Sequence, residues 1–261
     1  MRNKQETEEK HKVAVVTGAG RGIGQGIAIR LSENGYDVAI HFNTSAEGAR
    51  ETAERCQANG ARTMLLQADV RNMEDIGRMF EEIEEGFGAI DLMVCNAGVT
   101  RFQPFLEATP EMFDQVISTD LKGSYFCAQA GARSMVHHGK AGCIILISSN
   151  HMSGCWPQAS FYAAAKAGLA KAGENMALEL SEYGIRVVTI APGYTRLPSW
   201  GHTRGHSRIE KRIPAGRFAT PREIGNAVVF LASEQAGYIT GTTLFIDGGA
   251  LLPVITENRF V

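Results

Sequence analysis

The chain has 261 residues, of which 44% are hydrophobic and 21% charged, and its formal net charge at pH 7 is −2. This length and composition are typical of one globular α/β domain with a sizeable buried core. The near-neutral charge argues against general binding to nucleic acid or to an anionic membrane surface. The longest apolar run, residues 143–147, is far shorter than the roughly 20 residues of a membrane-spanning helix.

The N-terminus and the cysteines bear on cellular location. Residues 1–11 lack the apolar core of a signal peptide, so we expect a flexible N-terminal extension there. The cysteines form no CxxC pair and no metal-ligand spacing with histidine, so no metal site is expected. An odd, scattered set of thiols predicts a reduced, cytoplasmic protein. The cysteines are Cys56, Cys95, Cys127, Cys143 and Cys155.

Short runs rich in β-branched residues alternate with longer amphipathic segments from residue 13 to about residue 247. Several of the short runs are almost continuously apolar, as expected for strands that are covered on both faces. The alternation predicts right-handed βαβ units, and therefore a doubly wound, seven-stranded parallel sheet with helices on both faces. No linker or repeat divides residues 12–261, which are expected to form one domain. The predicted strands are residues 13–17, 37–41, 62–67, 92–96, 143–148, 185–191 and 243–247.

Three helix starts carry capping signals. A threonine followed three residues later by glutamate predicts a capping box at Thr44 and again at Thr220. Thr109, followed by Pro110, predicts a capped start for a single helix over residues 111–138.

A glycine-rich loop, TGAGRGIGQG, follows the first predicted strand at residues 17–26 and leads into a helical pattern. Glycines in this place allow a tight turn and a close approach of the backbone to a pyrophosphate at the helix N-terminus. A second register begins at Gly20 but lacks the threonine, and a purely structural turn is the other alternative. The position after the first strand favours phosphate binding. The preferred register, TGxxxGxG, uses Thr17, Gly18, Gly22 and Gly24.

Five motifs in fixed order resemble those of the short-chain dehydrogenase/reductase family. Among the six tyrosines, only Tyr162 is followed by a lysine four residues later. The likeness covers essentially the whole chain after residue 11. It implies a single-domain Rossmann fold and an oxidoreductase that uses a nicotinamide dinucleotide. The motifs are TGxxxGxG at 17–24, CNAG at 95–98, Ser149, YxxxK at 162–166 and PG at 192–193.

The resemblance also implies a set of cofactor contacts, in which Asp69 binds the adenine amino group. An acidic residue at the end of the second strand would bind the ribose 2′-hydroxyl and repel a 2′-phosphate. Residues 41–45, HFNTS, contain no carboxylate, whereas Arg21 offers a cation. We therefore expect NADP(H), with NAD(H) and a merely solvated Arg21 as the alternatives. The expected contacts are Gly18, Arg21, Gly22, Ile23, Gly24, Asn43, Thr44, Ser45, Asp69, Val70, Asn96, Ala97, Gly98, Tyr162, Lys166, Pro192, Gly193 and Thr195.

Tyr162 and Lys166 lie one turn apart on a predicted helix and can therefore reach one pocket. A free tyrosine titrates near pH 10, and a neighbouring ammonium group favours the phenolate. We expect Tyr162 to act as the general acid/base of hydride transfer, and Lys166 to bind the nicotinamide ribose as the resemblance implies. Ser149, at the family's spacing before Tyr162, is expected to hold the substrate oxygen, with Ser148 as the alternative. An ordinary surface pair and a strand-terminal serine are the purely structural interpretations.

Two positions depart from the family pattern. Asp120 stands where family members usually carry an asparagine, which is thought to hold a proton-relaying water. An aspartate there is expected to accept a hydrogen bond from that water, to pair with Lys166 and to oppose phenolate formation, so that activity is retained with a shifted pH profile. Thr195 is expected to contact the nicotinamide carboxamide through its backbone. Two positions later, where a threonine is often found in the family, this sequence has Leu197.

The substrate is predicted from two segments. Residues 194–216, which include Trp200, correspond to the family's variable substrate lid, and a solvated loop is the alternative. His151 and Trp156 form the expected opposite wall and are similar to bacterial glucose 1-dehydrogenases, which suits a sugar or polyol. A 3-oxoacyl-(acyl-carrier-protein) reductase is the main competitor and would need a basic docking surface, for which residues 133–140 offer only a small basic group. A dinucleotide-binding regulatory protein without catalysis is a third hypothesis, supported by Asp120 alone.

Small residues on the helix predicted at 161–182 permit close packing against another helix. The resemblance implies a homotetramer built on this helix and the one at 111–138. Dense packing against the sheet explains the small residues equally well.

Overall fold

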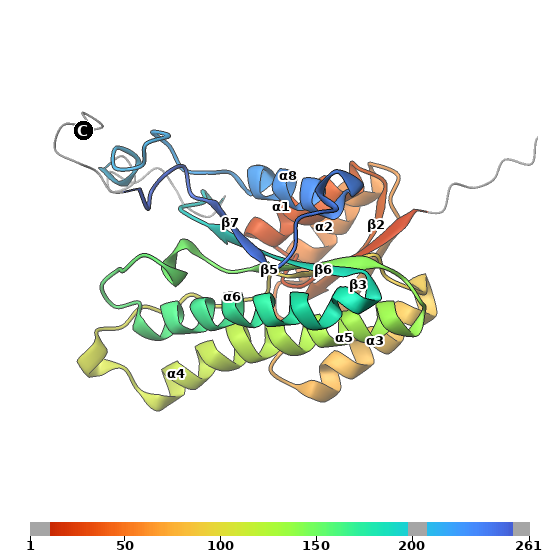
Figure 1. Ribbon diagram of the computed structural model, residues 1–261, viewed down its shortest axis with the longest axis horizontal. Helices are drawn as coiled ribbons and strands as arrows, with labels where there is room; N and C mark the ends of the chain where they lie inside the picture. Colours follow the sequence, from red (N-terminus) through yellow and green to blue (C-terminus); the bar gives the residue numbers. More distant parts are fainter. Residues whose placement is uncertain (1–10, 198–207, 253–261) are drawn as a thin grey trace, which may run out of the picture.

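The computed structural model describes residues 11–197 and 208–252 (Figure 1). The expected N-terminal extension, apart from its last residue, and Trp200 in the expected lid lie outside these described residues. Within them, one sheet of seven parallel strands runs through the molecule in the order β3-β2-β1-β4-β5-β6-β7. The predicted fold class is confirmed. The strands are β1 (Lys12–Val16), β2 (Tyr36–Phe42), β3 (Thr63–Gln67), β4 (Leu92–Cys95), β5 (Gly142–Ile147), β6 (Ile185–Pro192) and β7 (Thr242–Ile246).

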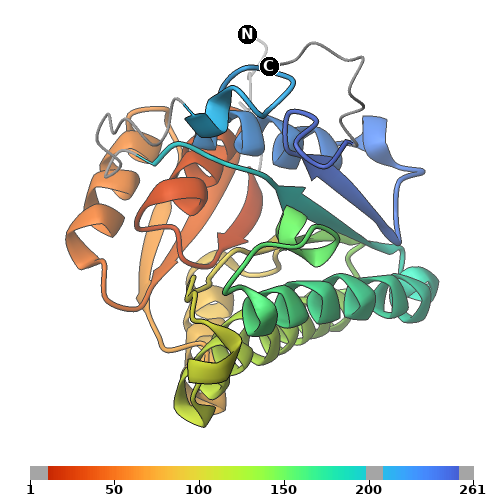
Figure 2. The ribbon, with the colours of Figure 1, turned by 90° about the vertical axis from the view of Figure 1, so that its left-hand side faces the viewer.

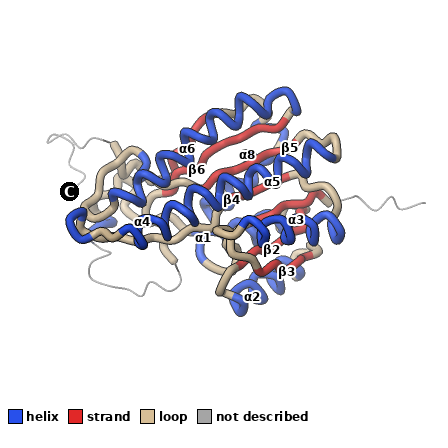
Figure 3. Tube along the Cα trace, turned by 90° about the horizontal axis from the view of Figure 1, so that it is seen from below, coloured by secondary structure: helices blue, strands red, loops and turns tan. Residues whose placement is uncertain are grey.

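Helices cover both faces of the sheet. Helices α1, α2 and α8 pack on one face, and α3, α5 and α6 lie side by side across the other (Figures 1 and 3). Figure 2 shows the strands between these two helical layers. Among the described residues, no helix is long and apolar enough to cross a membrane. The α-helices are α1 (Gly22–Ser32), α2 (Ala46–Gln57), α3 (Met73–Phe87), α4 (Pro110–Val116), α5 (Ser124–His137), α6 (Ser160–Leu180) and α8 (Pro221–Ala232).

The apolar runs of the sequence are the central strands. Side chains alternate between the faces of a strand, so Ala14 and Val16 of β1 pack under α1 and α8, whereas Val13 and Val15 pack under α3 and α5. All seven residues of β2 are buried. Four of the five cysteines are buried and Cys155 is exposed, and all five are free thiols. Burial raises the pKa of Cys127 to about 12 and that of Cys143 to about 11.

Two of the three predicted helix starts are confirmed. The Thr220 capping box is complete, and the Thr109 side chain accepts a hydrogen bond from the Met112 N–H. The box at Thr44 was wrong, because α2 begins at Ala46 with Ser45 as the capping position and no side-chain cap. Ser45 Oγ instead donates to the Gly20 carbonyl, 3.3 Å away, which ties the start of α2 to the glycine loop.

The helix predicted over residues 111–138 is interrupted. Between α4 and α5, residues Ile117–Gly123 form a π-helical segment, labelled η2, which contains Asp120. Hydroxyl bonds to backbone carbonyls, such as Thr119 Oγ1 to Gln115 O at 2.8 Å, compete with regular helix pairing here. Gly123 lets this π-helical segment approach the loop after β3 closely, because a Cβ atom would lie 2.8 Å from Val70. Segments of this kind are frequent at functional sites.

Candidate active site

The glycine loop forms a cradle where the strand order reverses beside β1. Gly18 and Gly22 have φ values of 65° and 60°, in the left-handed region that favours glycine. Helix α1 begins at Gly22 without a side-chain cap and has no acidic residue in its first turn. A Cβ atom on Gly24 would lie 2.3 Å from the Gly18 carbonyl oxygen. Free N–H groups at an uncapped helix start, reached through a compact loop, fit the phosphates of a dinucleotide.

The CNAG motif fastens the glycine loop to β4. Thr17 Oγ1 accepts hydrogen bonds from the N–H groups of Asn96 and Ala97, at 2.9 and 3.0 Å. The Asn96 amide donates to the carbonyl of Thr17 at 2.8 Å and to that of Gly18 at 3.2 Å. The threonine of TGxxxGxG and the asparagine of CNAG therefore act together to fix the loop at the carboxyl ends of two neighbouring strands.

The residues expected around the adenosine half gather at the ends of β2 and β3. Asn43, Thr44 and Arg21 are exposed. Asp69 faces the same region, and a two-pronged contact from Arg71, with Nε at 2.9 Å and Nη2 at 2.5 Å, lowers the pKa of its carboxyl group. An adenine amino group at Asp69 would therefore share the carboxylate with a guanidinium group.

The remaining expected cofactor residues lie at the same edge of the sheet. Ile23 is partly buried in the first turn of α1, and Val70 is buried against η2. Pro192 ends β6, and the Gly193 N–H donates to the Ile246 carbonyl at 2.9 Å. Thr195 is buried and its hydroxyl donates to the Gly193 carbonyl at 3.2 Å.

Helix α6 brings the tyrosine and lysine together at the end of β5. Lys166 is 4% exposed, and its Nζ lies 5.7 Å from the centre of the Tyr162 ring. Of the two candidate serines, Ser148 donates its hydroxyl to the Lys166 carbonyl at 2.8 Å. Ser149 instead lies 3.1 Å, Oγ to Nδ1, from His151. The structure thus separates a serine that anchors α6 from one whose hydroxyl lies among the side chains of the candidate site.

Lys166 and Asp120 form a buried ion pair. Lys166 Nζ lies 3.1 Å from Asp120 Oδ2 and donates to the Ile147 carbonyl at 3.1 Å. Asp120 is 0% exposed, and its Oδ1 accepts from the Val99 N–H at 2.8 Å. Burial lowers the pKa of Lys166, but the attraction and hydrogen bonding of Asp120, together with the attraction of Tyr162, outweigh burial and leave that pKa raised. The pairing expected from the sequence is present.

Gly98 makes room for this ion pair. A Cβ atom at residue 98 would lie 2.8 Å from Asp120 Oδ2 and 3.4 Å from Lys166 Nζ. A larger residue at position 98 would therefore collide with the Asp120 side chain and crowd that of Lys166, which come from two other segments.

An aromatic wall stands beside the tyrosine. The His151 ring stacks on Trp156 at 4.0 Å between centroids and meets the Tyr162 ring edge-on at 5.3 Å. Phe102 stacks on the other side of His151 at 5.7 Å, and Trp156 Nε1 donates to the Tyr194 hydroxyl at 2.9 Å. Burial lowers the pKa of His151. His151 and Trp156 thus lie beside Tyr162. Phe102, in a loop without a local motif, was not predicted, whereas Tyr194 directly follows the PG motif and lies in the segment expected to form the lid.

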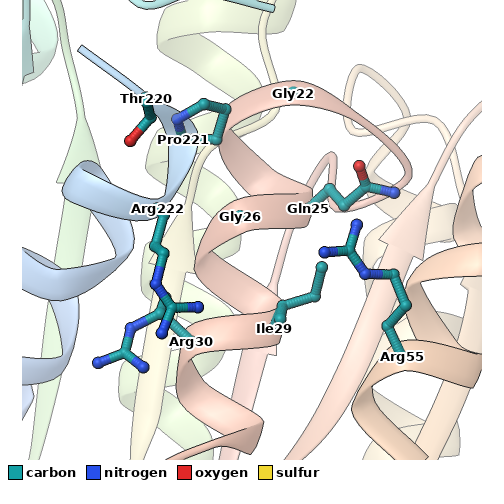
Figure 4. Close-up of a pocket in the computed structure, with 9 residues that line it drawn as sticks. All are labelled: Gly22, Gln25, Gly26, Ile29, Arg30, Arg55, Thr220, Pro221 and Arg222. Carbon is teal, nitrogen blue, oxygen red and sulfur yellow. The ribbon is translucent and has the colours of Figure 1, made fainter. Parts of the chain in front are cut away.

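A separate cavity of about 210 Å³ lies between α1, α2 and α8 (Figure 4). Three arginines line it, but Arg30 and Arg222 both pair with Glu33, and Arg55 lies 3.7 Å from Glu51. Gly22 at the start of α1 lines this cavity, but none of the candidate catalytic residues does. It is distinct from the site at the ends of β4 and β5.

Comparison with known proteins identifies the family. A family model described as enoyl-(acyl carrier protein) reductase matches residues 18–250. The chain is 36% identical to 3beta-hydroxysteroid dehydrogenase 1 of Eggerthella lenta over 251 residues, covering 93% of this chain and 95% of the relative. It is 36% identical to 3-oxoacyl-(acyl-carrier-protein) reductase FabG of Staphylococcus aureus over 240 residues, covering 91% and 97%.

A solved structure gives the same result. The crystal structure of acetoin dehydrogenase YohF from Salmonella typhimurium matches with a TM-score of 0.88 and 35% identity, covering 95% of this chain and 99% of that one. Members of the family are oxidoreductases that use a nicotinamide dinucleotide, in agreement with the glycine cradle. The chain belongs to the short-chain dehydrogenase/reductase family.

Proposed function

We propose that the protein interconverts a secondary alcohol and the corresponding ketone, or a sugar hemiacetal and its lactone, with NADP(H) as the preferred cofactor. The observation that carries the proposal is the convergence of Tyr162, the buried Lys166 and Ser149 after β5, with Ser149 reaching Tyr162 through the ring of His151. When bound, the dinucleotide supplies the hydride acceptor or donor. In oxidation Tyr162 removes the hydroxyl proton as the carbon–hydrogen bond breaks, and in reduction it returns a proton to the ketone oxygen.

Ser149 and Lys166 have separate tasks in this mechanism. The Ser149 hydroxyl holds the substrate oxygen beside the Tyr162 phenol. The Lys166 ammonium attracts the phenolate and binds the ribose next to the reacting ring. Asp120, 3.1 Å from Lys166 Nζ, partly cancels that attraction. The expected consequence is an enzyme that keeps its activity but oxidises alcohols at a higher pH than a variant with the family's asparagine.

The preference for NADP(H) is supported by the surface at the end of β2. Residues 41–45 contribute no carboxylate, and the exposed Arg21 lies in the loop whose Gly20 contacts Ser45. A 2′-phosphate there would meet a cation and neutral donors. A kcat/KM much higher with NAD⁺ than with NADP⁺ would reverse this assignment.

The substrate proposed is a small compound with an oxygen next to the reacting carbon, such as a polyol, a sugar or a hydroxyketone. His151 lies within hydrogen-bond distance of Ser149 Oγ, and the hydroxyl of Tyr194 lies behind Trp156. A second oxygen on the substrate would find polar partners in this wall, while its carbon skeleton would pack on aromatic rings. The printed name of the Salmonella relative, acetoin dehydrogenase, agrees with this size and chemistry.

Reduction of 3-oxoacyl groups on an acyl carrier protein is the second candidate, because a relative of that name is 36% identical. A carrier of acidic character requires unpaired cations near the site. Lys140 instead pairs with Asp91 at 2.6 Å, and His138 lies 3.8 Å from Glu84. The small basic group at residues 133–140 is thus partly neutralised and lies near the amino-terminal ends of β4 and β5, away from the candidate site, so it gives no support to a carrier.

The homotetramer and the cytoplasmic location remain predictions. Support for assembly through α5 and α6 comes from apolar side chains that these helices and the turn after α6 leave exposed, among them Tyr125, Leu178 and Tyr183. Sedimentation of the purified protein as a monomer would remove the tetramer from the proposal.

The decisive experiment tests a panel of substrates with both cofactors, and then tests the effect of removing the hydroxyl oxygen of Tyr162. Polyols, sugars, acetoin, steroids and a 3-oxoacyl thioester are assayed with NADP(H) and NAD(H). The Tyr162→Phe variant is expected to lose about 10²- to 10⁴-fold in kcat, the range of general acid/base catalysis. Tyr238→Phe, at an exposed tyrosine outside both the site and the proposed assembly surface, is the matched control and should be fully active. Undiminished turnover by Tyr162→Phe would overturn the mechanism, and inactivity of the wild type on every substrate would favour a regulatory protein.

A further inference from the structure

A buried histidine links the segments that form the dinucleotide cradle. His41 lies in β2 and is 1% exposed. Its Nδ1 is 3.1 Å from the backbone nitrogen of Gly18, and its Nε2 is 3.0 Å from the carbonyl oxygen of Ala68. The imidazole therefore connects the glycine loop to the segment after β3, across the strand that carries it.

The two partners fix the protonation of the ring. A backbone N–H is only a donor, so Nδ1 must be the unprotonated acceptor of the Gly18 hydrogen bond. A carbonyl oxygen is only an acceptor, so Nε2 must carry the proton that it donates to Ala68. Both contacts are satisfied by a single neutral tautomer. A second proton on Nδ1 would point at the Gly18 N–H, and the two groups would have to separate.

The surroundings favour the neutral ring. Burial lowers the pKa of His41, opposed by the hydrogen bond to Ala68 and by the negative charge of Asp69. On the β3 side, Asp69 pairs with Arg71, and the Asp69 N–H donates to Asp75 at 2.9 Å. On the β1 side, the glycine loop presents the exposed Arg21. The charged group that influences His41 is therefore the Asp69 carboxylate, which is already paired with Arg71.

The segments that meet at His41 are the ones that a dinucleotide must contact together. Gly18 opens the glycine loop, Asn43 and Ser45 follow His41 at the end of β2, and Asp69 follows Ala68. Backbone bonds reinforce the junction, since the Ala19 N–H donates to the His41 carbonyl at 2.8 Å and the Ala68 N–H to the Phe42 carbonyl at 3.1 Å. Movement of the Gly18 N–H would shift the start of the phosphate cradle relative to the adenosine end.

We propose that His41 is a positioning residue for the cofactor, whose neutral imidazole holds the glycine loop in its binding conformation and whose protonation weakens dinucleotide binding in acid. The inference rests on the dinucleotide chemistry of the family and is independent of the substrate proposed above. It makes cofactor binding and the loss of a proton from His41 linked events. Dinucleotide affinity then falls as the pH drops through the range in which His41 takes up a proton.

The first test measures the dissociation constant of NADP⁺ for the substrate-free protein by calorimetry between pH 5 and pH 8. For the wild type, Kd is expected to rise toward acid pH with a slope of at most tenfold per pH unit, the linkage limit for one proton. The 2′-phosphate of NADP⁺ titrates near pH 6, so NAD⁺, which lacks it, is measured in parallel. If Kd has the same pH slope for both ligands, the titrating group is in the protein and not in the 2′-phosphate.

Two variants separate the contacts of the ring. In His41→Asn the amide oxygen replaces Nδ1 and can still accept from Gly18, so Kd at pH 8 should stay within about threefold of wild type while its pH slope flattens. In His41→Gln the amide reaches the place of Nε2 and loses Gly18, so Kd should rise about tenfold at every pH, the loss of roughly one hydrogen bond. An unchanged slope in His41→Asn would overturn the proposal.

A measurement on the wild type guards against variants that fail to fold. The His41 ring is followed by NMR through a pH titration, with and without saturating NADP⁺. Binding should shift the protonation of His41 to lower pH, whereas a titration unaffected by NADP⁺ would overturn the proposal. Because neither experiment contains an alcohol or ketone, a wrong substrate leaves both results intact.

Discussion

The two halves of the site bury polar side chains in opposite ways. On the β1–β3 side, His41 is 1% exposed and neutral, with each ring nitrogen matched to one backbone group. On the β4–β6 side, Asp120 and Lys166 are 0% and 4% exposed and are charged partners of one another. The first arrangement requires the absence of a proton, and the second requires two opposite charges to be present together.

This difference determines how each half responds to change. A neutral ring between fixed backbone groups is sensitive to added protons and insensitive to the loss of a distant charge. A buried ion pair tolerates acid until its carboxylate is protonated, but removal of one partner leaves the other uncompensated in a poorly solvated place. The cofactor half is therefore expected to respond first to pH, and the catalytic half to mutation.

The largest effect is expected from breaking the ion pair. Lys166→Met leaves Asp120 buried without its counter-charge and should reduce the free energy of unfolding at pH 7 by about 3 kcal/mol. Adding Asp120→Asn removes the stranded charge while keeping an acceptor for the Val99 N–H, and should recover at least half of the loss. Urea unfolding measures both. The exposed Lys171, paired with Glu174 on the same helix, gives the control Lys171→Met, for which less than about 0.5 kcal/mol is expected.

Equal stability of Lys166→Met and the double variant would mean that the Asp120 carboxylate costs no stability when it loses its partner. The catalytic half would then be as insensitive to the loss of a charged group as the cofactor half, and the contrast drawn between the two halves would be wrong.

A smaller effect is expected on the pH dependence of turnover. Asp120→Asn leaves the attraction of Lys166 for the phenolate uncompensated, so the rising limb of kcat/KM for alcohol oxidation should move about one pH unit toward acid. The same substitution removes the charge that raises the pKa of Lys166. Asp114→Asn, at an exposed aspartate one helical segment away, should leave the profile in place. Coincident profiles for all three proteins would contradict the role given to Asp120.

The smallest effect is expected on stability in mild acid. Because burial lowers the pKa of His41 below that of an unfolded histidine, about 6.5, the unfolded chain takes up this proton first. Stability should therefore be fully present above about pH 6.5 and should fall as the pH decreases, by at most about 1.4 kcal/mol per pH unit from this group. The free energy of unfolding is measured with urea as a function of pH for the wild type and for His41→Asn. The difference between the two curves isolates the contribution of His41 from that of His151. Parallel curves would show that His41 takes up its proton over the same pH range in the folded and unfolded chains, which would contradict this prediction.

The sequence predicted the parts of the fold that depend on local pattern. All seven strands lie within two residues of their predicted limits, because a buried parallel strand has a nearly continuous apolar signature. The relation between Tyr162 and Lys166 was predictable for the same reason, since helical periodicity alone places them on one face. The motif order then located Ser149 and the glycine loop.

Features set by contacts between distant segments were not predictable in this way. The π-helical segment around Asp120 depends on hydroxyl bonds and on the approach of Val70 to Gly123, which the local sequence does not reveal. The cap at Thr44 failed because the Ser45 hydroxyl is diverted to the glycine loop. His41 reads as an ordinary strand residue until Gly18 and Ala68 are seen beside its ring.

The distribution of thiols gives the pocket a built-in attachment point for a spectroscopic reporter. Four of the five cysteines are buried, whereas Cys155 is exposed and directly precedes Trp156, whose ring stacks on His151. A maleimide dye would therefore react selectively at the edge of the aromatic wall in the natural sequence, without an engineered cysteine. Its emission could follow the arrival of cofactor and of substrate as separate optical events in a stopped-flow instrument.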